Sequence, residues 1–171
     1  MMDSVSLALT GRIPVDDRER ASIAAFLDAV KHLERPFDEH ADLTHVTGSA
    51  IVVGPRGVVL HLHKRLGIWL QPGGHIDEGE TPWDAALREA EEETGLEVRH
   101  PAAGPLLVHV DVHPGPRGHT HLDLRYLLEA DDAEPAPPPE ESQDVCWFSW
   151  DDAIAVADPG LVGALRAVRP S

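Results

Sequence analysis

The chain has 171 residues, about the length of one domain, with 42% hydrophobic and 26% charged residues. This composition is typical of a globular protein whose core is large enough to fold without metals or disulfides. The charge is unusual, because 30 acidic residues face 14 basic ones and give a formal net charge of -16. Such a charge repels phosphate backbones and anionic lipids, which argues against a general nucleic-acid or membrane binder. An anionic substrate would need local positive charge, which a divalent metal ion supplies.

A single cysteine, Cys146, excludes an internal disulfide framework and a multi-cysteine zinc site and fits a reducing compartment. Its strand-like surroundings predict a small buried residue rather than a nucleophile. No segment reaches the roughly 18 consecutive apolar residues of a membrane span, and Asp3 stands where a signal peptide carries a basic flank. We expect a soluble, cytoplasmic protein that is a monomer or a homodimer.

The first part of the chain predicts a helix followed by a hairpin. Acidic residues can cap a helix over residues 16–35, in which apolar residues recur at helical spacing. Strands are expected over residues 45–53 and 58–64. The run Gly-Pro-Arg-Gly at 54–57 has the composition of a turn, so the two strands should form a hairpin.

A glycine-rich passage over residues 67–80 leads into a second helix. Thr81 and Pro82 open this helix, since proline suits the first helical position, where its missing amide would be unpaired anyway. The helix is expected to run to Thr94 and to end at Gly95, a favourable C-cap.

The remaining chain predicts further strands and two terminal helices. The strands are expected over residues 106–113, 121–128 and 145–150. The acidic, proline-rich residues 131–144 form a loop, and helical stretches follow over residues 151–168, the second beginning at Pro159. The alternation of strands and helices indicates a mixed α/β layer structure, which we expect to be one domain over residues 1–171.

Two neighbouring predicted strands carry polar residues on one face. The polar positions, which alternate with apolar ones, are His109, Asp111, His113, His121, Asp123 and Arg125. A short turn joins the strands, so antiparallel pairing should bring both polar sets to the same face of the sheet. Two interpretations stay open, a wet outer face or the wall of a substrate cavity. In the second, Arg125 would bind a phosphate or carboxylate through two hydrogen bonds.

Three glutamates of the second helix favour a metal site. Glu89, Glu92 and Glu93 stand at positions i, i+3 and i+4, which places their carboxylates on one helix face. Like charges at this spacing repel each other, so a solvated acidic helix would gain no stability from them. Mg²⁺ and Mn²⁺ prefer such oxygen ligands, and the sequence therefore predicts a site for a hard divalent cation.

Residues 74–96 place these glutamates in a longer pattern. The pattern is Gly, five residues, Glu, seven residues, Arg-Glu, two residues, Glu-Glu, one residue, Gly and an apolar residue. A chance match is on the order of one in a million. The segment resembles the Nudix box. This resemblance implies an α/β/α sandwich with a mixed central sheet and hydrolysis of a nucleoside diphosphate linked to another moiety.

The resemblance also implies roles for individual residues. The ligands of Mg²⁺ or Mn²⁺ would be Gly73, through its carbonyl, and Glu89, Glu92 and Glu93. Arg88 would orient the glutamates, Glu80 would tie the loop to the helix, and Gly74 and Gly95 would be structural. The base that activates the water is open: it would be Glu92, or Glu141 or Asp144 of the acidic loop.

The identity of the substrate, a small phosphorylated molecule, is not indicated. Residues outside the box that we expect to contact it are His63, Arg65, Trp69, His113, His121 and Arg125. The substrate markers of the ADP-ribose, diadenosine polyphosphate and coenzyme A hydrolases of the family are missing. Two alternatives remain, a Nudix-fold regulatory or ligand-binding domain without turnover and an enzyme similar to isopentenyl diphosphate isomerase. The isomerase uses a cysteine upstream of the box, where this chain has none.

Overall fold

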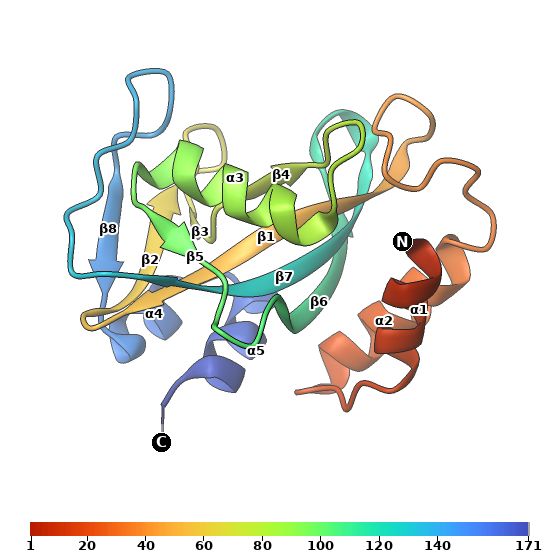
Figure 1. The fold of residues 1–171 in the computed structure, drawn as a ribbon, viewed down its shortest axis with the longest axis horizontal. Helices are drawn as coiled ribbons and strands as arrows, with labels where there is room; N and C mark the ends of the chain where they lie inside the picture. The colour runs from red at the N-terminus through yellow and green to blue at the C-terminus, as the bar shows by residue number, and fades with distance from the viewer. Residues whose placement is uncertain (171) are drawn as a thin grey trace.

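A mixed sheet forms the centre of the fold (Figure 1). The structure is a computed structural model and describes residues 1–170. Its strands are β1 (Thr44–Gly54), β2 (Gly57–Leu62), β3 (Trp69–Leu70), β4 (Gly73–His75), β5 (Val98–Arg99), β6 (Leu106–Pro114), β7 (Thr120–Ala130) and β8 (Val145–Phe148). Its helices are α1 (Met2–Thr10), α2 (Asp17–Ala29), α3 (Pro82–Thr94), α4 (Trp150–Val156) and α5 (Pro159–Val168), with a short 3-10 turn, η1 (Pro116–Gly118).

The order and direction of the strands explain how distant segments meet. The main path through the sheet is β3-β2-β1-β7-β5, while β8 pairs with β2, β4 with β1 and β6 with β7. Strands β1 and β7 run parallel, with His45 opposite His121 and Ser49 opposite Arg125. The other strand pairs are antiparallel. The central strand β1 therefore lies beside both the glycine-rich β4 and the polar β7.

Helices cover both faces of this sheet. Helix α3 packs on one face, against β1 and β4, and α4 and α5 pack from the other side, against β2 and β6 (Figure 1). Ala85, Ala86 and Ala90 of α3 share a hydrophobic cluster with residues of β1 and β7. Leu161 and Leu165 of α5 share a second cluster with residues of β1 and β2. The predicted α/β/α sandwich with a mixed central sheet is confirmed.

Helix α2 covers the free edge of β6, a strand that pairs with β7 alone. The buried Glu19 carboxylate accepts a hydrogen bond from the Val110 amide (3.0 Å), and the Ser22 hydroxyl accepts one from the Val112 amide (3.1 Å). Arg12, which donates to Glu19 at 2.6 Å, also donates to carbonyl groups of β6. Backbone amide and carbonyl groups at this strand edge, which have no neighbouring strand, thus form hydrogen bonds with side chains instead.

Most predicted elements are confirmed, and the differences have local causes. The helix predicted over residues 16–35 is wrong beyond Ala29, where α2 gives way to i→i−3 hydrogen bonds. Helix α1 and the short strands β3, β4 and β5 are absent from the sequence prediction. For the strands the reason is that two or three residues show no periodicity. Cys146, predicted to be buried, is exposed on β8. Among residues 1–170, no helix has the length and apolar character that crossing a membrane requires.

The approach of α3 to β1 depends on small residues on both sides. A Cβ atom at Gly48 of β1 would overlap the carbonyl oxygen of Pro82 and lie 3.3 Å from atoms of Ala85 and Ala86. Real Cβ atoms do not tolerate an overlap with a backbone oxygen, so any side chain here must displace the helix. Gly48 thus fixes the depth at which α3 lies on the sheet.

We predict that Gly48→Ala lowers the free energy of unfolding by about 1–3 kcal/mol, because the added methyl forces α3 off β1. Urea unfolding followed by circular dichroism measures this change. Gly11→Ala is the matched control, because a Cβ there meets only the Leu7 carbonyl oxygen, at 3.8 Å, and the backbone is in a right-handed helical conformation. Equal effects of the two substitutions would show that the helix is not held at this distance by Gly48.

Candidate active site

Helix α3 is delimited by signals in its own sequence. The Thr81 hydroxyl accepts a hydrogen bond from the Asp84 amide (3.2 Å) and caps the first turn, with Pro82 at the first helical position. Gly95 ends the helix in a left-handed conformation (φ 66°) that residues other than glycine rarely adopt. The three glutamates therefore lie in the last two turns of a well-defined helix.

Arg88 connects these glutamates to the loop before the helix. Its Nε and Nη2 atoms donate to the two carboxylate oxygens of Glu80, each at 3.0 Å, and Nη2 also donates to the His75 carbonyl at 2.9 Å. Its Nη1 atom donates to Glu89 at 2.8 Å and to Glu92 at 3.3 Å. A single guanidinium therefore holds the loop and orients two of the carboxylates.

The two glycines of β4 also contact the glutamates of α3. The Gly73 amide donates a hydrogen bond to Glu93 Oε2 at 2.9 Å. A Cβ atom at Gly74 would overlap the carboxylate of Glu89, so the close approach requires glycine at this position. The backbone of β4 and the carboxylates of α3 are thus in direct contact.

The electrostatics of this group are those of crowded negative charges. Burial, together with the charges of Glu89, Glu141 and Glu92, raises the pKa of Glu93 to about 8, although the Gly73 amide opposes this shift. Burial also raises the pKa of Glu89 above its ordinary value, although Arg88 opposes this shift. Hydrogen bonds to Glu80 and Glu89 raise the pKa of Arg88, which stays charged. One cation therefore faces several carboxylates.

This donor set suits a hard divalent cation. It combines carboxylate oxygens on one helix face with the backbone of Gly73, and these are the ligand types that Mg²⁺ and Mn²⁺ take. The raised pKa values of Glu89 and Glu93 indicate that positive charge is lacking where their carboxylates meet. The residues that could hold the ion are those named by the motif: Gly73, Glu89, Glu92 and Glu93.

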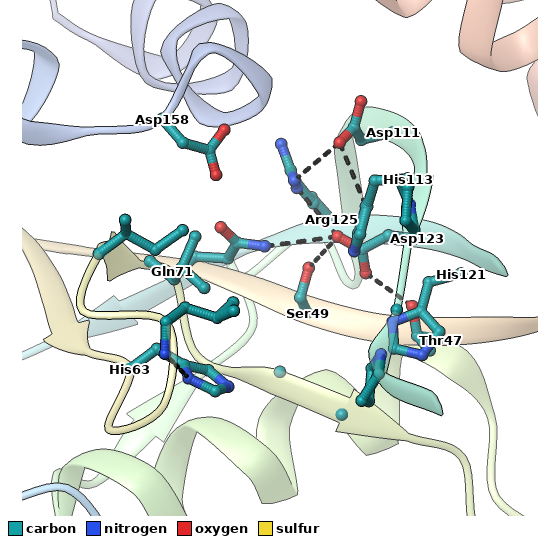
Figure 2. Close-up of a pocket in the computed structure, with 18 of the residues that line it drawn as sticks. Thr47, Ser49, His63, Gln71, Asp111, His113, His121, Asp123, Arg125 and Asp158 are labelled. Carbon is teal, nitrogen blue, oxygen red and sulfur yellow. Dashed lines mark hydrogen bonds and ion pairs between the residues drawn. The ribbon is translucent and has the colours of Figure 1, made fainter. Parts of the chain in front are cut away.

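A cavity of about 500 Å³ opens beside the glutamates. Its lining includes Gly73, Gly74 and Glu93 and residues of β1, β6 and β7, together with the segment between β2 and β4 and single residues from helical regions. Figure 2 shows part of this lining. A cavity of this size lies within the range that small-molecule ligands occupy. Two of the four proposed metal ligands, Gly73 and Glu93, thus border a space that could take a nucleotide-sized molecule.

Asp123 of β7 organises one wall of this cavity. Its carboxylate accepts hydrogen bonds from Thr47 (3.0 Å) and Ser49 (2.9 Å) of β1, from Gln71 (3.4 Å) and from the Arg125 Nε atom (3.0 Å) (Figure 2). The parallel pairing of β1 and β7 brings these donors together. Their side chains are thereby held in fixed orientations around the cavity.

The Arg125 guanidinium forms its hydrogen bonds and ion pairs with groups inside the protein. Its side chain is 3% exposed, and its guanidinium also donates to the Gly160 carbonyl of α5 and lies 3.5 Å from Asp111. Burial would raise the pKa of Asp111, but hydrogen bonds from His113 and Arg18 and the charge of Arg125 hold it well below its usual range. The antiparallel pairing of β6 and β7 is confirmed, and the interpretation as a wet outer face is wrong, because these charged groups are buried.

The structure gathers most of the predicted substrate contacts around the cavity. Those that line it are His63, Arg65, His113, His121 and Arg125. Trp69 is not among the lining residues, because its ring packs edge-on against Phe148 (centroids 4.8 Å apart) in the second hydrophobic cluster.

The two candidate bases of the acidic loop differ in position. The charge of Glu141 acts on both Glu89 and Glu93, whereas the charge of Asp144 acts on Cys146. The loop is attached on both sides of Glu141, because Lys64 donates to the Glu140 carbonyl (2.6 Å) and the buried Ser142 hydroxyl donates to the Leu62 carbonyl (2.7 Å). Of the two candidates, Glu141 is thus the one whose charge reaches the glutamates of α3 and whose loop is tied to β2 and the residues after it.

Sequence reasoning missed several residues of the cavity. Those from outside the predicted strand pair are Arg18, Thr47, Ser49, Gln71 and Asp158. Alternation of polar and apolar residues along β1 was a usable signal for Thr47 and Ser49, although the strand's partner was unknown. No local pattern indicates Arg18 or Asp158, which reach the cavity from separate helical regions.

Comparison with known proteins agrees with this geometry. A family model described as "NUDIX domain" matches residues 43–168. The asymmetrical bis(5'-nucleosyl)-tetraphosphatase of Caenorhabditis elegans is 30% identical over 101 residues, which are 57% of this chain and 70% of that protein. The NAD-capped RNA hydrolase NudC of Salmonella paratyphi C is 30% identical over 102 residues, 60% of this chain but 37% of that protein.

Solved structures give the same assignment. The crystal structure of a NUDIX-family hydrolase from Clostridium perfringens superimposes with a TM-score of 0.61 and 29% sequence identity, covering 73% of this chain and 98% of that one. The region that matches the family model contains the complete motif, helix α3 and most of the residues that line the cavity. This chain therefore belongs to the NUDIX family of hydrolases.

Proposed function

We propose that this protein hydrolyses a pyrophosphate linkage in a nucleoside diphosphate-type metabolite, with a divalent metal ion and by attack of water at phosphorus. The observation that carries the proposal is the group of crowded glutamates on α3, of which Glu89 and Glu93 are partly buried and Glu93, bound by the Gly73 amide, lines a cavity of about 500 Å³. Mg²⁺ or Mn²⁺ would be held by Gly73, Glu89, Glu92 and Glu93. The ion would neutralise charge on the phosphate oxygens and lower the pKa of a bound water.

The protein's own residues position the reacting groups. Arg88 holds Glu89 and Glu92 at fixed orientations through Nη1, and the Gly73 amide fixes Glu93. Glu141 is the residue that we propose as base, because its charge acts on Glu89 and Glu93, its loop is tied to Leu62 and Lys64, and the glutamates of α3 would be engaged as metal ligands. It would accept the proton of the water as the oxygen attacks phosphorus.

Positive charge at the cavity rim would bind the substrate's phosphates. Arg65 lines the cavity, is exposed and forms no ion pair with any of residues 1–170, unlike Arg125. We propose Arg65 and the neighbouring His63 as phosphate contacts and assign Arg125 to positioning the wall. The bis(5'-nucleosyl) tetraphosphate named for the nematode relative is the first substrate to test. The cytoplasmic location and the monomeric or dimeric state stay predictions.

The alternatives from the sequence have less support. An isomerase that relies on cysteine is disfavoured because Cys146 lies on β8 and is not among the residues that line the cavity. A binding domain without turnover would not require Glu89, Glu92 and Glu93 to stay on one helix face, since like charges at this spacing repel each other.

We predict that Glu92→Gln lowers kcat at least 100-fold in the presence of Mg²⁺ or Mn²⁺, because a ligand is lost. The Glu92 side chain is 56% exposed, so the melting temperature without metal should stay similar or rise slightly. A panel of nucleoside diphosphate derivatives, dinucleoside polyphosphates and NAD identifies the substrate by released phosphate or nucleotide.

Glu91→Gln is the matched control for this experiment. Glu91 is an exposed glutamate of the same helix, but it lies outside the i, i+3, i+4 face, so the rate should change less than twofold. Near wild-type activity of Glu92→Gln would contradict the mechanism. Activity that survives complete removal of divalent ions would do the same.

We predict that Glu141→Gln lowers kcat at least tenfold with little change in KM, because the substituted amide cannot accept the proton. Asp144→Asn is the control, since Asp144 lies in the same loop but acts on Cys146 rather than on the triad. Steady-state kinetics of both variants on the identified substrate make the comparison. A larger loss in Asp144→Asn would transfer the role of base to that residue.

A further inference from the structure

A second group of potential metal ligands lies apart from the glutamates and consists of imidazoles. One ring nitrogen from each of four histidines lies within 4.8 Å of the corresponding nitrogens of the others: His45, His75, His119 and His121. We call this group the histidine cluster. Imidazole suits Zn²⁺ and other late transition metals, whereas the carboxylates of α3 suit Mg²⁺ and Mn²⁺.

The sheet topology builds this cluster from three neighbouring strands. His45 of β1 lies opposite His121 in the parallel register with β7, and β4, which carries His75, pairs with β1. His119 directly precedes β7. The ring centroids of His75, His119 and His121 lie 5.1, 5.0 and 5.2 Å from that of His45. The other three rings therefore all neighbour His45, and one nitrogen of each ring lies within reach of a common ion.

The cluster contains buried nitrogen atoms that lack hydrogen-bond partners within residues 1–170. These atoms are Nε2 of His45, His75 and His121 and Nδ1 of His119. His45 is completely buried, so water cannot easily compensate its Nε2 atom. An unsatisfied buried polar atom destabilises the folded protein. Each of the four rings thus has a buried nitrogen whose lone pair or N–H is not satisfied by the part of the chain that the structure describes, which is what a group of metal ligands shows.

In His45 and His75, hydrogen bonds of Nδ1 fix the orientation of the ring and of its Nε2 atom. Nδ1 of His45 lies 3.3 Å from the Asp42 carbonyl, and Nδ1 of His75 lies 3.1 Å from a carboxylate oxygen of Glu39. A carbonyl or carboxylate only accepts hydrogen bonds, so Nδ1 must carry the proton and Nε2 presents a lone pair to the cluster. Histidine ligands of metals are fixed in this way by outer-shell carbonyls and carboxylates.

We propose that the histidine cluster binds one Zn²⁺ ion through four imidazole nitrogens, at a site separate from the carboxylates of α3. The ion would join β4, β1 and β7 at one end of the sheet. Because His75 follows Gly73 and Gly74, the ion would also steady the segment that contacts Glu89 and Glu93. This proposal does not depend on the proposed function, since it concerns binding and stability.

Zinc binding to untagged, chelator-stripped protein tests the proposal. Titration with Zn²⁺ against a chromogenic chelator, with millimolar Mg²⁺ present for the carboxylates, should show one tight equivalent. His119→Gln should weaken binding at least tenfold and remove the rise in melting temperature that Zn²⁺ gives the wild type. His119 lies before β7 and is only half-buried, so this variant should fold. The control is His32→Gln, an exposed histidine outside the cluster, which should bind normally.

Two further measurements identify the ligands. Co²⁺ bound in place of Zn²⁺ should give the intense visible absorption of a tetrahedral site, and this absorption should be lost in His45→Gln. Glu92→Gln should leave the zinc equivalent unchanged. Absence of tight zinc binding in the wild type would overturn the proposal. So would equal binding by His119→Gln, or loss of the zinc equivalent in Glu92→Gln.

Discussion

The close contact of helix α3 with strands β1 and β4 is the constraint on which the site depends. Gly48 and the alanines of α3 remove the side chains that would separate helix from sheet, and Gly74 lets the Glu89 carboxylate lie against the backbone of β4. The same contact brings Glu93 to the Gly73 amide. Negative charge is thereby concentrated where burial makes it costly, and a divalent cation is the natural complement.

A protein of net charge -16 must still accept an anionic substrate. The buried acidic residues of the cavity wall form hydrogen bonds and ion pairs with neighbouring side chains. Asp123 and Asp111 are surrounded by hydroxyl, amide and guanidinium donors, so their charges are compensated within the wall. In our proposal, phosphate would be bound by the exposed Arg65, which lines the cavity, and by a metal ion held on α3. In this account Arg125 neutralises the buried carboxylates of the wall, and Arg65 would bind the substrate.

Local sequence signals predicted the parts of the site that are contiguous in the chain. The motif over residues 74–96, the caps of α3 and the polar alternation along β6 and β7 all depend on spacing within one element. The same alternation could not show that Arg125 is bound by Asp111 and Gly160, because those partners come from other strands and helices. Trp69 was misplaced for a similar reason, since proximity in sequence to the motif does not determine which way a ring packs.

The histidine cluster shows what topology adds to sequence. The composition shows that the chain has 11 histidines, but no sequence pattern links those at positions 45, 75, 119 and 121. The parallel pairing of β1 with β7 and the insertion of β4 beside β1 bring them together. Parallel pairing between strands so distant in the chain leaves no turn signal, unlike the hairpin between β1 and β2.

Hydrolysis of the identified substrate in ¹⁸O-labelled water tests the central claim most directly. Water attack at phosphorus places one ¹⁸O atom on a phosphate product, which mass spectrometry of the separated products detects. Label in a carbon-bound hydroxyl group, or a rearranged product without label, would contradict the account and assign the site to another reaction.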